Sequence, residues 1–323
     1  HGVITRDADG DAMLQEIPPL QMKPVERAVR AEQLGYASIW LSDHVVTERT
    51  TTNDHPANVS GKRPYPVRPP LLAVPTTLAA IASRTTKLRL APSVYIAPYR
   101  HPLITAHEFA TIDVLSGGRA LLAVGIGWEK GEFAALGVEF DDRGSITEES
   151  IEIYKQAWTR QEIDYSGKHF DIHDVSMDPK PVQKPHIPIW YGGVTKVAAR
   201  RAARHCAALF PMFLDAWTTP ENHAALHDEV KREADRIGRD LTGFIYAGFC
   251  QAQLTDDAKV ASRFRGTRPL LTGTPQQVID GLAAFSKAGY SHLALHFDCP
   301  SATVAEWDEQ LERFGAEVLP FVK

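Results

Sequence analysis

The stretch that most constrains the fold is Lys87–Glu129, which contains a complete strand–helix–strand unit. Lys87–Ile96 has the composition of a strand, and after a proline-containing turn the apolar residues from Leu103 to Leu115 recur at roughly helical spacing. Gly117-Gly118 is typical of a helix end, and Arg119–Val124 is a second apolar run. Two apolar strands joined by a crossover helix predict parallel strands that are buried on both faces.

The rest of the chain repeats this unit, with about eight predicted strands alternating with about eight helices. We therefore predict an α/β fold, a (β/α)8 TIM barrel with insertions, formed by residues 1–323 as a single domain. The main alternative is an open doubly wound sheet with a cap domain. The predicted strands outside the first unit are Val3–Thr5, Ala37–Leu41, Ile187–Tyr191, Ala207–Phe210, Phe244–Ala252 and His292–Phe297.

The sequence also predicts two insertions and the start of one helix. A polar loop at about residues 45–70 has a length typical of functional or mobile loops, and a segment at about 160–185 is predicted to be an insertion that carries a hairpin. Thr274-Pro275-Gln276-Gln277 predicts a capping box with proline in the first helical position.

The composition argues against several classes of protein. The net charge of −5 over 323 residues gives no reason to expect binding to nucleic acid or to a membrane surface. The cysteines, Cys206, Cys250 and Cys299, are far apart, which argues against a disulfide framework or a zinc cluster. No apolar run reaches the about 18 residues of a membrane span, and no signal peptide is seen. We therefore expect a cytoplasmic protein.

In a barrel of this kind, active groups lie where strands end and loops begin. Asp43-His44 follows a predicted strand directly, and a histidine there can donate a hydrogen bond or transfer a proton near neutral pH. The alternative role for His44 is to stabilise the following loop. Gly192-Gly193-Val194-Thr195 precedes a helix whose free N–H groups suit an anion, with Lys196 and Arg200 adding positive charge. A glycine pair before a helix is also common in ordinary turns.

Other sequence patterns argue against a dinucleotide-binding fold and against common catalytic motifs. Gly125-Ile126-Gly127 looks like the start of a dinucleotide-binding fingerprint, but the third glycine, Gly131, comes one residue late. We interpret these glycines as room for a flat ligand beside the backbone. The remaining histidines form no ligand set, and no HExxH, P-loop or GxSxG motif is present, so no metal is expected. A metal hydrolase with ligands from distant strands is the alternative.

Four ordered segments resemble the bacterial luciferase-like superfamily of flavin and deazaflavin enzymes. They are GYASIWLSDH, PYRHPLITAHEFATIDVLSGGRALLAVGIGWEKGEFAALGVEFDDRG, PHIPIWYGGVTKVAARRAAR and TPQQVIDGLAAFSKAGYSHLALHF. The first three cover most of residues 25–206, and the fourth fits the C-terminal part of that family. The resemblance implies a (β/α)8 barrel with a cofactor ring across its mouth and a small-molecule substrate, and it implies that the segments at about 45–70 and 160–185 shape access for that substrate.

The resemblance also implies roles for individual residues. Asp43 and His44 would lie beside the reactive edge of the ring as catalytic residues, with Asp43 also contacting the cofactor. Ser93, Val94 and Tyr95 match the strand behind the ring, which often carries a non-proline cis peptide bond. Gly125 and Gly127 match a strand end near the ring and its ribityl chain. The phosphate-binding turn is matched by Gly192, Gly193, Val194, Thr195 and Lys196.

Two chemistries stay open within this resemblance. With coenzyme F420 the enzyme would transfer a hydride to or from a small organic substrate, and with reduced FMN it would act as a monooxygenase. The Asp43-His44 pair and the run Gly125–Phe133 resemble the deazaflavin branch more closely, so F420 is favoured and FMN is the alternative. Many relatives carry an Asp-Gly pair where this chain has Cys206-Ala207. The resemblance therefore does not predict how the wall of the pocket near these residues is formed. A cofactor-free binding barrel is the third hypothesis.

We predict that His44 hydrogen-bonds the substrate oxygen while the hydride moves. Tyr65, Tyr99 and Trp128 are predicted to line the substrate cavity, although buried aromatic side chains more often belong to the core. The resemblance further implies a homodimer, for which the Ala-rich helix Leu71–Ser83 is a candidate interface.

Overall fold

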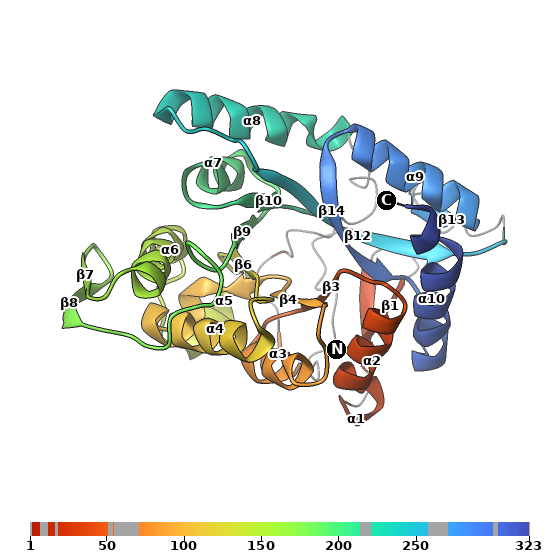
Figure 1. The fold of residues 1–323 in the computed structure, drawn as a ribbon, viewed down its shortest axis with the longest axis horizontal. Coiled ribbons are helices and arrows are strands. Elements are labelled where there is room, and N and C mark those ends of the chain that lie inside the picture. Colours follow the sequence, from red (N-terminus) through yellow and green to blue (C-terminus); the bar gives the residue numbers. More distant parts are fainter. Residues whose placement is uncertain are drawn as a thin grey trace.

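The computed structural model of this chain describes residues 2–6, 12–16, 19–50, 54, 71–213, 221–257, 271–299 and 303–322. Parallel strands form the centre, and helices cover their outer side (Figure 1). This is the (β/α)8 barrel that the alternation of strands and helices predicts.

Parallel pairing continues around the barrel. β3 (Ser38–Leu41) pairs with β4 (Arg89–Pro92), which reaches β6 (Leu122–Gly125) through a bridge between Leu90 and Ala120. β6 also pairs with β5 (Tyr95–Ile96) and with β9 (Ile189–Gly192), and β9 pairs with β10 (Ala208–Phe210). β10 and β11 (Met212–Phe213) pair with β12 (Ile245–Leu254), whose other partners are β13 (Thr272–Gly273) and β14 (Tyr290–Phe297).

The barrel closes where β14 lies beside β3 and beside β1 (Gly2–Arg6). β1 also pairs antiparallel with β2 (Ala12–Glu16). The helices are α1 (Pro19–Met22), α2 (Pro24–Gln33), α3 (Val74–Ala82), α4 (Pro102–Ser116), α5 (Lys130–Ala135), α6 (Arg143–Thr159), α7 (Lys196–His205), α8 (Glu221–Ile237), α9 (Pro275–Lys287) and α10 (Val304–Glu317), with short 3-10 turns η1 (Ala97–Tyr99) and η4 (Leu319–Phe321).

Side chains alternate between the barrel interior and the helix layer, as strand geometry requires. The interior holds one buried cluster that combines alanines with large side chains: Ala91, Leu121, Ala123, Trp190, Ala208, Phe210, Ala247 and Ala294, with Trp40 and Phe249 packed against it. Trp40 stacks on Phe210 with ring centroids 4.6 Å apart. Because the alanines leave the space that the aromatic rings fill, the interior is a packed core and not a pore.

Two local predictions are confirmed. The segment at 160–185 carries an antiparallel hairpin of β7 (Ile163–Ser166) and β8 (Asp171–Val175). Thr274 and Gln277 form the capping box at the start of α9. The loop predicted at about 45–70 lies mostly outside the described residues.

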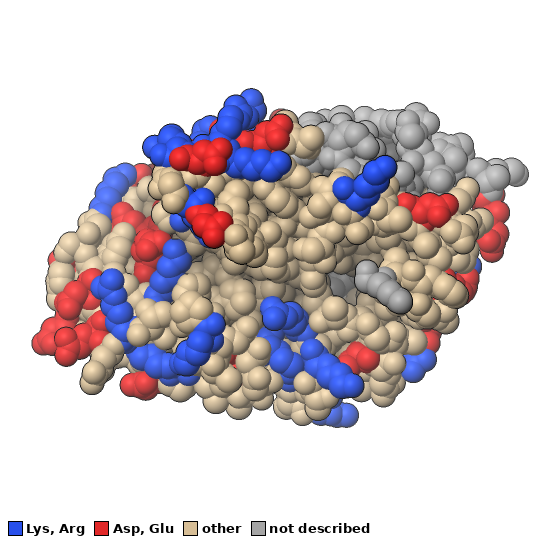
Figure 2. Space-filling model, turned by 45° about the horizontal axis from the view of Figure 1, so that its top comes forward, with Lys and Arg blue, Asp and Glu red and all other residues tan. Residues whose placement is uncertain are grey.

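Charged side chains are unevenly distributed on the surface. Figure 2 shows a face whose charged side chains lie mostly toward its edge, around a largely uncharged and hollowed centre. Among the described residues, no helix combines the length and the apolar character needed to cross a membrane.

Candidate active site

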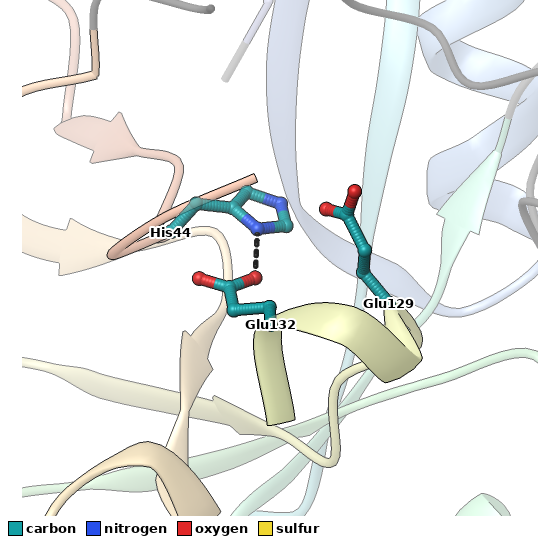
Figure 3. A group of neighbouring side chains, drawn as sticks. All are labelled: His44, Glu129 and Glu132. Carbon is teal, nitrogen blue, oxygen red and sulfur yellow. Dashed lines mark hydrogen bonds and ion pairs between the residues drawn. The ribbon is translucent and has the colours of Figure 1, made fainter. Parts of the chain in front are cut away.

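His44 follows β3 at the C-terminal end of the barrel, and it is paired with a carboxylate from a distant part of the chain. Its Nδ1 lies 2.6 Å from Oε2 of Glu132, which is in the first turn of α5. Figure 3 shows the two side chains facing each other. The side chain of Glu132 is 0% exposed and that of His44 is 11% exposed. The pair therefore lies at the barrel mouth, largely shielded from water.

The carboxylate of Glu132 is held by further donors. Oε1 accepts hydrogen bonds from the backbone N–H of Val45 at 2.6 Å and of Val46 at 3.2 Å, and the Tyr99 hydroxyl donates to Oε2 at 2.8 Å. Burial alone raises the pKa of Glu132, but the hydrogen bonds and the charge of His44 outweigh burial, and the pKa lies below its ordinary value. Glu132 is therefore ionised at neutral pH.

This pairing defines the proton arrangement of His44. An ionised carboxylate can only accept hydrogen bonds, so the Nδ1 of His44 carries a proton. Nε2 is then the ring nitrogen whose lone pair can accept a proton or a hydrogen bond. In such an arrangement a buried carboxylate fixes both the tautomer and the orientation of the imidazole.

A second carboxylate, Glu129, also lies beside the His44 ring (Figure 3). Glu129 is fully buried, and its Oε1 accepts a hydrogen bond from the backbone N–H of Glu48 at 3.0 Å. The side chain of Glu48 in turn accepts a hydrogen bond from the backbone N–H of Gly131. The chain after β3 is thus fastened to the start of α5 by reciprocal hydrogen bonds.

His44, Glu129 and Glu132 offer ligand atoms that all lie within 4.8 Å of one another, a spacing that suits a metal ion. The histidine and carboxylate spacings in the sequence gave no indication of this group, because its members are joined only by the fold. However, both oxygens of Glu132 already accept two hydrogen bonds each. We therefore interpret the group as a hydrogen-bonded carboxylate–imidazole array.

Asp43 faces a different partner. Its two carboxylate oxygens accept hydrogen bonds from the two terminal nitrogens of Arg100, both at 2.8 Å, and the backbone N–H of Ile96 donates to Oδ2 at 2.9 Å. The guanidinium of Arg100 also lies over the ring of Tyr95, 4.4 Å from its centroid. These contacts show Asp43 fixing the turn after β5, beside His44.

Val94 forms the floor of the mouth between two glycines. A Cβ on Gly125 would lie 2.4 Å from Cγ2 of Val94, and a Cβ on Gly192 would lie 2.6 Å from Cγ1. These glycines therefore leave space for Val94, and not only for a ligand as the sequence suggested. The Ser93–Val94 peptide bond is cis, as the family resemblance implies. Tyr95 points away from the mouth, against Phe109 of α4.

The predicted anion-binding turn leads from β9 into α7. Gly193 has φ +147°, a conformation that favours glycine, and the Thr195 hydroxyl caps α7 by accepting from the N–H of Ala198 at 3.1 Å. Lys196 is exposed at the first helical position. Arg200 pairs with Glu229 of α8 at 2.7 Å, so its contribution to an anion site is reduced.

The three aromatic residues predicted to line a substrate cavity fall in different places. Tyr65 lies outside the described residues. Tyr99 is 7% exposed, its ring packs against Phe133, and its hydroxyl donates a hydrogen bond to Glu132. These contacts are with buried residues of the protein. Trp128 is half-buried just after β6.

Together these features bring a histidine–carboxylate pair, an apolar floor and a helix N-terminus to the mouth of the barrel. Residues 22–265 match the luciferase-like monooxygenase family, and the chain belongs to that family. The family and the fold predicted from the sequence are therefore confirmed.

The relatives include users of two cofactors. An F420-dependent glucose-6-phosphate dehydrogenase of Kineococcus radiotolerans is 25% identical over 93% of both chains. An FMNH(2)-dependent dimethylsulfone monooxygenase of Pseudomonas putida is 27% identical over 76% of this chain and 77% of that protein. An F420-dependent glucose-6-phosphate dehydrogenase of Amycolatopsis mediterranei is 30% identical, but this match spans only 50% of that protein and 56% of this chain.

Solved structures show the same division. An F420-dependent secondary alcohol dehydrogenase aligns with a TM-score of 0.73 at 18% identity, over 94% of this chain and 95% of its own. A type II Baeyer-Villiger monooxygenase of Pseudomonas putida with FMN aligns with a TM-score of 0.72 at 17% identity, over 98% of this chain and 95% of its own. These two structures support the fold alone. The family relationship confirms the predicted class, a flavin- or deazaflavin-dependent oxidoreductase.

Replacing Gly125 by alanine is expected to destabilise the protein by about 1–3 kcal/mol, because the new methyl group overlaps Val94 in a packed interior. Urea unfolding measures this change. The same substitution in a Val94→Ala background should cost markedly less, since the overlapping methyl groups are gone. Equal costs in the two backgrounds would show that Val94 is not the reason for the glycine.

Replacing Glu132 by glutamine should lower the free energy of unfolding at pH 7 by about 1–3 kcal/mol, because a charged acceptor of several hydrogen bonds is lost. Since the folded-state pKa of Glu132 lies below the ordinary 4.5, its contribution is complete above that pH and is lost as the pH falls through the lower value. The difference between wild type and variant should therefore shrink in acid. The exposed Glu139→Gln is the control, and a pH-independent difference would contradict this assignment.

Proposed function

We propose that this protein is a coenzyme F420-dependent oxidoreductase that transfers a hydride to or from a small organic substrate. The observation that carries this proposal is the His44–Glu132 pair, whose 2.6 Å contact leaves Nε2 of His44 as the proton-exchanging atom. Hydride transfer between a carbonyl and an alcohol requires a proton on the same oxygen, and one positioned imidazole can provide or accept it.

His44 is the residue that exchanges this proton. Its Nε2 takes the proton of a substrate hydroxyl when the hydride leaves, or donates it to the oxygen in the reverse direction. Glu132 stabilises the imidazolium in either direction, because its carboxylate stays ionised beside Nδ1. General acid–base catalysis of this kind contributes about 10²–10⁴-fold to the rate. The deazaflavin ring supplies the hydride-accepting or hydride-donating carbon when it is bound.

The residues at the mouth fit such a cofactor. Val94 gives a smooth apolar floor for a flat ring, and the buried hydroxyl oxygen of Ser93 has no hydrogen-bond partner among the described residues. The N-terminus of α7, with Gly193 and Lys196, suits the phosphate of the cofactor side chain. Asp43 acts through Arg100 and Ile96 and so positions the mouth, and Tyr99 positions Glu132.

Oxygen insertion with reduced FMN is the second candidate. The relative from Pseudomonas putida favours it, since it aligns over three quarters of this chain (76%) and is named an FMNH(2)-dependent monooxygenase. The same floor and the same helix N-terminus suit FMN. The third hypothesis, a barrel that binds ligands without a cofactor, is weakened by the histidine–carboxylate pair, which a binding protein does not require.

We also propose that the protein is a cytoplasmic homodimer. Most apolar residues of α3, the helix expected at the interface, are already buried within this chain, including Leu78 and Ile81. The neighbouring α4 instead exposes Ile104, Val114 and Leu115 at 56%, 43% and 60%. We therefore place the interface on α4, which light scattering of wild type and Leu115→Glu tests.

The cofactor is decided by titration of the purified protein with F420 and with FMN, each oxidised and reduced, followed by fluorescence. The proposal predicts tight binding of F420 and binding of FMN that is at least about tenfold weaker. Substrate trials should then use alcohols, ketones and imines. Selective binding of reduced FMN would favour the monooxygenase instead, and binding of neither cofactor would overturn both.

Replacing His44 by alanine should lower kcat by about 10²–10⁴-fold, because the proton-exchanging group is lost. The dissociation constant of the cofactor should stay within about threefold, since His44 acts on the substrate. Replacing the exposed His173 on the β7–β8 hairpin by alanine provides the matched control. Full turnover of His44→Ala with the true substrate would remove His44 from the mechanism.

A further inference from the structure

A distinct layer of residues lies between the packed interior cluster and the barrel mouth. Side chains that face the barrel interior recur at every second residue of a strand. The residue two positions after each member of the interior cluster therefore also faces the interior, one layer closer to the C-terminal end of the barrel. Two residues beyond Ala91, Ala123, Trp190, Phe249 and Ala294 lie Ser93, Gly125, Gly192, Gln251 and His296, which we call the mouth layer.

The mouth layer has two unlike halves. Toward β4, β6 and β9, Val94 occupies the space that the glycines leave. Toward β12 and β14, the layer consists of Gln251 and His296, which are direct partners in the parallel register of these strands. A flat ligand on the floor therefore meets an apolar surface on one side and polar side chains on the other.

His296 carries an unsatisfied polar atom in this layer. Its Nδ1 is buried and has no hydrogen-bond partner among the residues that the structure describes. Its ring lies near that of Phe249, with centroids 5.9 Å apart, and burial lowers its pKa to about 4. A neutral ring that leaves a buried nitrogen unpaired carries a free-energy cost, which a bound ligand with a complementary polar group would remove.

The order of strands places His296 opposite the phosphate-binding turn. From β9 the barrel continues through β10 and β12 to β14 in one direction, and through β6 and β4 to β3 in the other. β14 and β3 lie side by side. A ligand that is anchored by its phosphate after β9 and lies across the mouth therefore points its far edge toward His296 and His44.

We propose that His296 is a cofactor-binding residue whose ring hydrogen-bonds the polar edge of the flavin or deazaflavin bound at the mouth. This inference rests on the proposed function, and it applies to either cofactor because both rings carry amide N–H and carbonyl groups on one edge. A neutral imidazole matches such an edge, since one nitrogen donates a hydrogen bond and the other accepts one.

The test is titration of the cofactor-free protein with oxidised F420 and, separately, with FMN, in the absence of substrate. His296→Leu should weaken binding of the favoured cofactor about tenfold, the size expected for one lost hydrogen bond in a shielded site. His296→Gln keeps a donor and an acceptor and should bind within about threefold of wild type.

His292→Leu is the matched control, because His292 lies on the same strand at an interior position on the other side of Ala294. Its Nε2 is 3.0 Å from the Ser38 hydroxyl, so its loss should lower the melting temperature without changing cofactor affinity. If His296→Leu does not fold, His296→Met replaces it. The nitrogen NMR signals of the His296 ring in the wild-type protein should also shift when the cofactor is added.

The outcomes separate the two proposals. Unchanged cofactor affinity in a folded His296→Leu variant would overturn the role of His296 while leaving the proposed function intact. A raised KM for the substrate with unchanged cofactor affinity would also overturn it, since the ring would then face the substrate. Failure of the wild-type protein to bind either cofactor would overturn the proposed function together with this inference.

Discussion

The buried hydrogen bond between Glu132 and His44 is the contact on which the rest of the site depends. A carboxylate removed from water is stable only where donors replace its hydration, and Glu132 has donors from Val45, Val46, Tyr99 and His44. These donors come from the chain after β3 and from the η1 turn after β5, whereas the carboxylate comes from α5. One ionised group therefore fixes three separate segments and the orientation of the His44 imidazole.

The position of Glu132 depends in turn on its neighbour Phe133. A helix of six residues such as α5 has little stability of its own, so tertiary packing must hold it. Phe133 is 0% exposed and packs edge-on against Tyr99 and Phe140, with ring centroids 4.9 Å and 5.1 Å apart. Tyr99 thus contacts Phe133 with its ring and Glu132 with its hydroxyl. The packing of α5 is therefore coupled to the position of the Glu132 carboxylate.

The sequence predicts the features that depend on local order along the chain. The crossover unit at Lys87–Glu129 and the capping box at Thr274 are short-range patterns, and the structure contains both. The pairing of Glu132 with His44 joins residues 88 positions apart, so no spacing in the sequence reveals it. The same holds for Arg200, which the sequence predicts to add charge to the anion site but which pairs with Glu229 of α8.

The barrel mouth has two parts with different properties, an apolar floor and a polar rim. Its floor, made by Val94 between Gly125 and Gly192, offers shape without charge and so accepts an isoalloxazine or a deazaflavin ring equally well. The rim carries His44, whose ring lies beside the buried carboxylates of Glu129 and Glu132. A reaction that moves a hydride and a proton together uses both parts. The rim, more than the floor, is therefore the part of the mouth that supports the proposed hydride transfer.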